Sequence, residues 1–63
     1  MERAEELVKQ FAEGSIGLPT FHRGIREESG ELADRSLMLL THYENSDLDL
    51  SALRQQVSDL IQS

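Results

Sequence analysis

The sequence has no cysteine and no tryptophan, and it contains a single proline, two phenylalanines and one tyrosine. Without cysteine, disulfide bonds and thiolate metal sites, which stabilise many small domains, are excluded. The 63 residues are expected to form a single helical domain, residues 1–63. A core of this size supplies only about 3–5 kcal/mol of net stability, so the fold depends on close helix packing or on self-association.

Long apolar runs and basic residues are also scarce. The longest apolar run, Leu37 to Leu40, is far too short to span a membrane. Residues 1–11 are acidic and amphipathic, unlike a secretory signal or a transit peptide, so we expect a cytoplasmic protein. Six basic residues against twelve acidic ones give a net charge of −6, and no local basic stripe is evident. Such a chain repels phosphate backbones and anionic membranes, so we expect no nucleic-acid or membrane partner, whereas a basic protein partner is compatible with the charge.

The spacing of apolar residues predicts an all-α fold, a small antiparallel helical bundle of three to four helices. In residues 2–13 the apolar residues recur with the helical period, and Gly14 follows as a left-handed stop. A second helix is expected to begin near Leu18, with Pro19 in its first turn, and to fade around residues 27–30. Gly30 either separates it from a third helix at about 31–44 or only dents one long helix. The inward face of the last helix, at about 50–62, is predicted to comprise Leu50, Leu53, Val57, Leu60 and Ile61.

Two stretches of the chain, GSIGLPTF (14–21) and SDLDLSAL (46–53), carry apolar residues at matched places, offset by 32 positions. Each is typical of a helix start with a hydrophobic staple, with Gly17 or Asp49 as the cap. The matching continues along both halves, which predicts two helical hairpins, residues 2–29 and 31–62. Either an internal duplication or the ordinary needs of a short-loop hairpin explains the pattern. The matched pairs are Leu7 with Leu39, Val8 with Leu40, Phe11 with Tyr43, Ile16 with Leu48, Leu18 with Leu50, Phe21 with Leu53, and Ile25 with Val57.

The third helix is more apolar than the first. Leu37 and Met38 stand where the first helix has Glu5 and Glu6. In a monomer the core is expected to absorb both residues. The alternative is a dimer contact through Leu37 or Met38, because a helix that is apolar on most sides is either central or covered by another chain.

No pattern of catalytic or metal-ligating residues is present, so we expect no enzyme activity, no cofactor and no metal site. His22 and His42 each adjoin an apolar core candidate and are predicted to lie on the surface. The segment DLDLS (47–51) begins like a calcium loop. However, it has Ala52 where such a loop needs glycine and Ser58 where it needs glutamate. Asp47 and Asp49 are therefore interpreted as turn and cap residues.

The segment ADRSLMLL (33–40) resembles the Asp-Ser-Leu attachment site of acyl carrier proteins, which are also small, acidic and helical. The resemblance implies that Ser36 carries phosphopantetheine. The residue before the serine is Arg35 here, and the long loop that precedes the attachment helix in that family is missing. The competing interpretation is that Ser36 is an ordinary helix residue.

An acidic run lies at the junction of the second and third helices. If the backbone stays helical through the junction, Glu27, Glu31 and Asp34 share one face. The run is either a solvated surface or the binding site for a basic protein, since complementary charge speeds association and sets specificity. The candidate partner-binding residues are Glu27, Glu28, Glu31 and Asp34.

Two further segments carry a family resemblance. LVKQFAEGSIGLPTF (7–21) resembles the opening of small immunity proteins of the colicin D and contact-dependent growth inhibition type, and DLDLSALRQQVSDLI (47–61) is similar to their closing helix. Together the two segments cover about half of the chain. The resemblance implies a bacterial, acidic helical bundle that neutralises a basic nuclease toxin by covering its active site.

Overall fold

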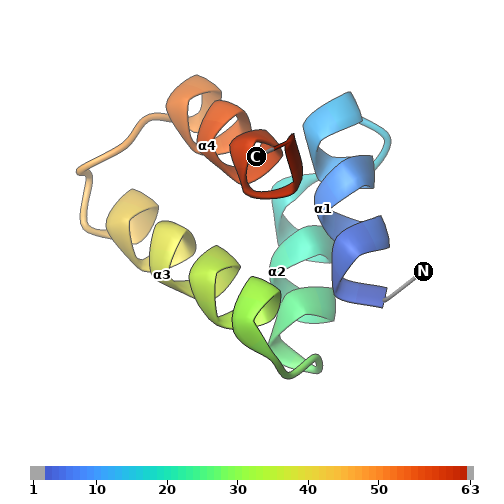
Figure 1. The fold of residues 1–63 in the computed structure, drawn as a ribbon. Helices are drawn as coiled ribbons and strands as arrows, with labels where there is room; N and C mark the ends of the chain where they lie inside the picture. The colour runs from blue at the N-terminus through green and yellow to red at the C-terminus, as the bar shows by residue number, and fades with distance from the viewer. Residues whose placement is uncertain (1–2, 63) are drawn as a thin grey trace.

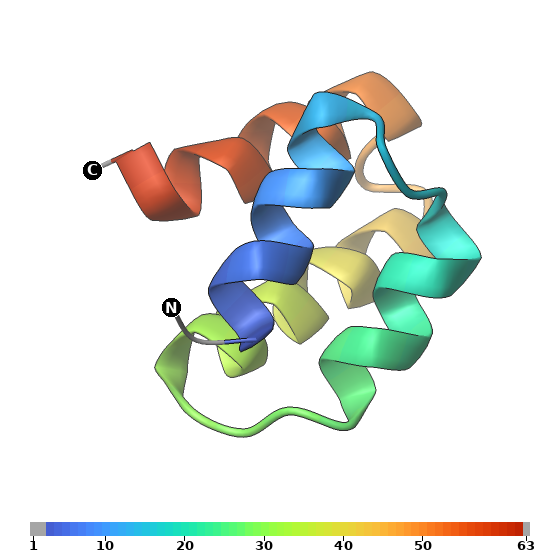
Figure 2. The same cartoon turned by 90° about the vertical axis from the view of Figure 1, so that its right-hand side faces the viewer.

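The computed structural model describes residues 3–62, which form four helices and no strand (Figure 1). The predicted all-α bundle is confirmed. The helices are α1 (Arg3–Glu13), α2 (Leu18–Arg26), α3 (Glu31–Glu44) and α4 (Leu50–Gln62). Helices α1 and α2 form one antiparallel hairpin and α3 and α4 the other. The second hairpin is turned relative to the first, so that α4 runs across α1 (Figure 2).

Local chemistry sets the ends of these helices. Gly14 has a φ of 83° and ends α1. The amides of Gly14 and Ser15 donate to the carbonyls of Phe11 and Gln10 at 3.1 and 2.8 Å, which satisfies carbonyls left free by the last turn. At the start of α4, Asp49 Oδ1 accepts a hydrogen bond from the Ala52 amide at 2.7 Å, which confirms Asp49 as the cap.

The junction between the hairpins is not helical. Helix α2 stops at Arg26, and Gly30, with a φ of 114°, is the N-terminal cap of α3. Gly30 therefore separates two helices, as one of the two predictions held. Residues 27–30 are not helical. Glu27, Glu31 and Asp34 therefore do not share one helix face, since that prediction required a continuous helix.

A single core lies between the two hairpins. Its centre is the stack of Phe11 on Phe21, with ring centroids 4.5 Å apart and planes 9° apart. The guanidinium of Arg54 lies over the Phe11 ring, 5.2 Å from its centroid, and so ties α4 to α1. The buried apolar residues are Ala4, Leu7, Val8, Phe11, Phe21, Ile25, Ala33, Leu40, Leu53 and Val57.

Two residues predicted on the inward face of the last helix, Leu50 and Leu60, are not part of the core; Leu60 is half-buried. Leu50, the first residue of α4, is 40% exposed rather than on the inward face. The core ends at Leu53 one turn later, and the half-buried Leu48, before the cap, packs against the core instead. The predicted first residue of the first helix, residue 2, lies outside the described residues.

Candidate protein-interaction surface

The four candidate acidic residues lie along the junction and the first turn of α3. Glu31 and Asp34 are exposed in that turn, where the helix dipole favours negative charge. Glu27 is exposed at the end of α2, and Glu28 is half-buried in the link. Glu31 Oε1 accepts a hydrogen bond from Arg35 Nη2 at 2.8 Å, an exposed pair that contributes only about 0.3–0.5 kcal/mol. The surface thus has three exposed carboxylates, and one of them, Glu31, forms an ion pair with Arg35.

Leu37 and Met38 have different surroundings. Leu37 is half-buried and packs against the core, as expected for a monomer. Met38 is 64% exposed, so the core absorbs only one of the two residues. Met38 lies on the outward face of α3, midway between Glu31 and the C-terminal end of the helix.

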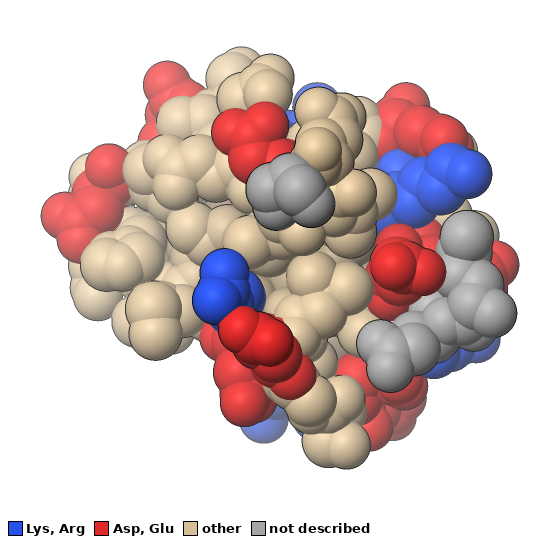
Figure 3. Space-filling view, in the orientation of Figure 1, with Lys and Arg blue, Asp and Glu red and all other residues tan. Residues whose placement is uncertain are grey.

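Next to Met38, a groove runs between α3 and α4. We call it the α3–α4 groove; its lining residues are Arg35, Met38, Leu39, His42, Gln56, Asp59 and Leu60. Asp59 on α4 is exposed, and its Oδ1 accepts a hydrogen bond from the side-chain Nε2 of Gln55 at 3.1 Å. Figure 3 shows this side of the molecule as a broad area without charged side chains, with acidic and basic groups towards its edges. The sequence pattern placed Leu60 on the inward face of the last helix and matched Leu39 with Leu7 of the first helix. It therefore did not predict a groove at these residues.

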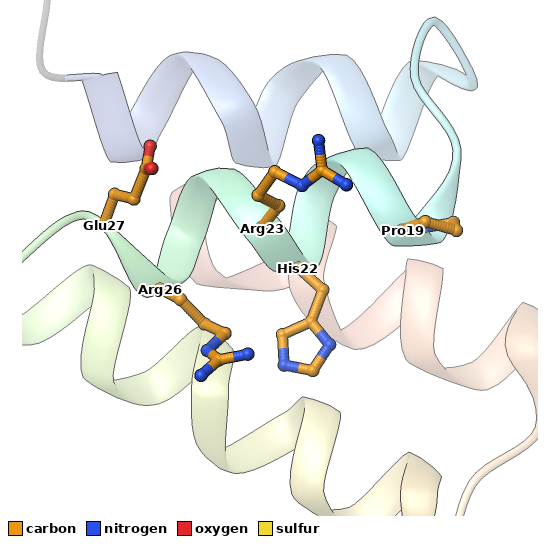
Figure 4. A pocket seen from close by; sticks show the side chains of 5 residues that line it. All are labelled: Pro19, His22, Arg23, Arg26 and Glu27. Carbon is orange, nitrogen blue, oxygen red and sulfur yellow. The ribbon is translucent and has the colours of Figure 1, made fainter.

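A basic cluster on α2 was also missed. His22, Arg23 and Arg26 line a shallow pocket with Pro19 and Glu27 (Figure 4). The sequence HRGIR (22–26) puts these basic residues close together along α2, but Glu27 lies beside them and they do not form a basic stripe. The side chains of His22 and Arg26 extend to one side of α2 and that of Arg23 to the other. The three side chains do not converge on one point, so they do not form an anion-binding site.

The two histidines each lie near a carboxylate. His22 Nδ1 is 3.8 Å from Glu44 Oε1, and His42 Nδ1 is 3.4 Å from Asp47 Oδ2. Within residues 3–62, no group of three or more histidine or acidic side chains is arranged to hold a metal ion. No helix in the same range is long and apolar enough to cross a membrane.

Ser36, the candidate attachment site, is completely buried in α3. Its hydroxyl has no hydrogen-bond partner among the described residues. A phosphopantetheine arm needs an accessible hydroxyl, so the burial of Ser36 argues against the carrier hypothesis.

No known protein family, no curated protein and no solved structure matches this chain. The resemblance to immunity proteins therefore stays a prediction from the sequence.

Proposed function

We propose that the chain is a protein-binding module without catalytic activity, which binds a basic protein through the acidic surface at the start of α3. The observation that carries the proposal is the exposure of Glu31 and Asp34 together on the first turn of α3. The net charge of −6 adds a long-range attraction for a basic partner and speeds the encounter.

The specific form of the proposal is neutralisation of a basic nuclease toxin in the bacterial cytoplasm. The resemblance of residues 7–21 and 47–61 to immunity proteins supports this form. An acidic module can block such a nuclease because its carboxylates take the place of substrate phosphates at the basic active site.

The test compares two pairs of charge reversals. The immobilised chain captures binding proteins from an extract of the cells that encode it, and the captured protein is purified and titrated. We expect Glu31→Lys with Asp34→Lys to weaken its binding roughly tenfold or more. The control, Glu5→Lys with Glu6→Lys, makes the same change of charge in the exposed first turn of α1 and should bind nearly as the unchanged chain does.

Two results would contradict the proposal. One is that no basic protein is captured, and the other is that both double variants weaken binding equally, which would indicate a response to net charge alone. The toxin form requires in addition that the captured protein cleaves nucleic acid and that one equivalent of this chain stops the cleavage.

A further inference from the structure

The α3–α4 groove stands out because it carries little net charge on a strongly acidic molecule. Arg35 on α3 and Asp59 on α4 offset each other, and Met38, Leu39 and Leu60 supply apolar surface between the two helices. Charged residues are depleted at the centres of protein interfaces, whereas methionine is enriched there. The lining of the groove, with Met38, Leu39 and Leu60 between two opposite charges, therefore resembles the centre of an interface.

Met38 is the most exposed large apolar side chain among the described residues, at 64%. The next is Leu50 at 40%, which does not line the groove. A methionine is flexible and adapts to an irregular apolar partner. Its place in the groove means that one docking event can cover Met38 together with Leu39 and Leu60.

The charges of the groove determine which partner fits it. We propose that a second copy of this chain occupies the α3–α4 groove in a two-fold dimer, with α3 of each copy against the groove of the other. A two-fold interface brings the same patch together twice, so the patch must complement itself. One arginine on the α3 side and one aspartate on the α4 side meet this requirement. The ion pair of Arg35 with Glu31 is exposed and therefore weak, so Arg35 of each copy can turn to Asp59 of the other.

Other contacts between two copies are less favourable. Two acidic surfaces repel each other. The basic residues of α2 line a pocket that has no exposed large apolar side chain among the described residues, so a contact there would rest on exposed ion pairs, which contribute little. The α3–α4 groove is thus the described surface that best suits a closed dimer.

The dimer is expected to be weak. Stable interfaces cover about 800 Å² on each partner, whereas the whole chain exposes 4184 Å². The groove is only part of that surface, so we expect a dissociation constant on the order of 10–100 µM.

The experiment uses the purified chain alone, so its result is independent of the basic partner proposed above. Sedimentation equilibrium from about 10 µM to about 1 mM should show the mass rising from 7.1 kDa towards twice that value. We expect Met38→Glu to weaken dimerisation at least about tenfold, because it places a charge in the apolar centre of the interface. Leu50→Glu is the matched control and should dimerise as the unchanged chain does.

A charge exchange tests the orientation of the two copies. Arg35→Asp and Asp59→Arg should each weaken dimerisation, and the double variant should recover it. Circular dichroism of each variant checks that the helices remain folded. A monomer at the highest concentration, equal effects of Met38→Glu and Leu50→Glu, no recovery in the double variant, or masses that rise beyond the dimer would each overturn the proposal.

Discussion

The two hairpins differ most where their helices approach each other. In the first hairpin Leu7 lies against Gly24, and a Cβ atom on Gly24 would come within 2.8 Å of the Leu7 side chain. The matched residues of the second hairpin, 32 positions later, are Leu39 and Gln56, and both line the α3–α4 groove. A glutamine does not allow the approach that a glycine allows. The groove lies where the second hairpin has Gln56 in place of the glycine of the first.

Three more matched pairs differ in the same direction. The buried Ala4 matches Ser36, which is buried and has no side-chain hydrogen bond to any residue in 3–62. The buried Phe11 matches the half-buried Tyr43, and the left-handed Gly14 matches Ser46, which is left-handed without being glycine. At each pair, the residue of the first hairpin thus fits its burial or its backbone conformation better than the matched residue of the second. We therefore expect substitutions at these positions to cost more in the first hairpin than in the second, which retains an exposed surface.

The largest expected effect compares Phe11→Ala with Tyr43→Ala. Phe11 is fully buried and stacked on Phe21, so its loss should lower the free energy of unfolding by about 3–5 kcal/mol, which is nearly all that a domain of this size has. The matched Tyr43 is half-buried, and its loss should lower the free energy by about 1–2 kcal/mol. Circular dichroism at 25 °C should show Phe11→Ala largely unfolded and Tyr43→Ala folded. Equal losses would show that the two hairpins contribute equally.

The intermediate effect concerns Ser36→Ala, which restores the residue found at the matched position, Ala4. The Ser36 hydroxyl is buried and has no hydrogen-bond partner in the part of the chain that the structure describes, and alanine also has the higher helix propensity. We expect a gain of about 1 kcal/mol, seen as a rise in melting temperature of roughly 4–8 °C. The control is Ser58→Ala in α4, where the hydroxyl accepts a hydrogen bond from Gln62 at 2.9 Å. If Ser58→Ala gives the same gain, helix propensity alone explains it and the buried hydroxyl of Ser36 is not costly.

Much of the fold could be predicted from the sequence because its signals are local. The helical period of the apolar residues, the stop at Gly14 and the cap at Asp49 each act within a few residues of themselves. Gly30 was ambiguous because a glycine can either dent a long helix or separate two helices; its φ of 114° does not allow a continuous helix.

The surface was less predictable because it depends on distances between helices. Periodicity put Leu39 and Leu60 on inward faces, but it contains no information on how closely α3 and α4 approach each other. The same limit applies to Met38, whose exposure follows from the position of α3 in the bundle. The acidic residues were located from sequence alone, but their relation to one another depended on whether the junction was helical.

The smallest expected effect is that of Ser46→Gly, at the turn after α3. Ser46 has a φ of 67°, and the amides of Ser46 and Asp47 donate to the carbonyls of Tyr43 and His42 at 3.1 and 2.9 Å. Gly14 and Ser15 make the same pair of bonds after α1, so the two turns have one geometry and differ in the residue that adopts it. A side chain in this conformation costs about 1 kcal/mol, which glycine avoids. Glycine also has more conformational freedom in the unfolded chain, which offsets part of this stabilisation. We therefore expect Ser46→Gly to raise the free energy of unfolding by about 0.5 kcal/mol in urea denaturation, and the reverse change, Gly14→Ser, to lower it by a similar amount. A loss of stability in Ser46→Gly would mean that the turn after α3 does not have the left-handed geometry that it shares with the turn after α1.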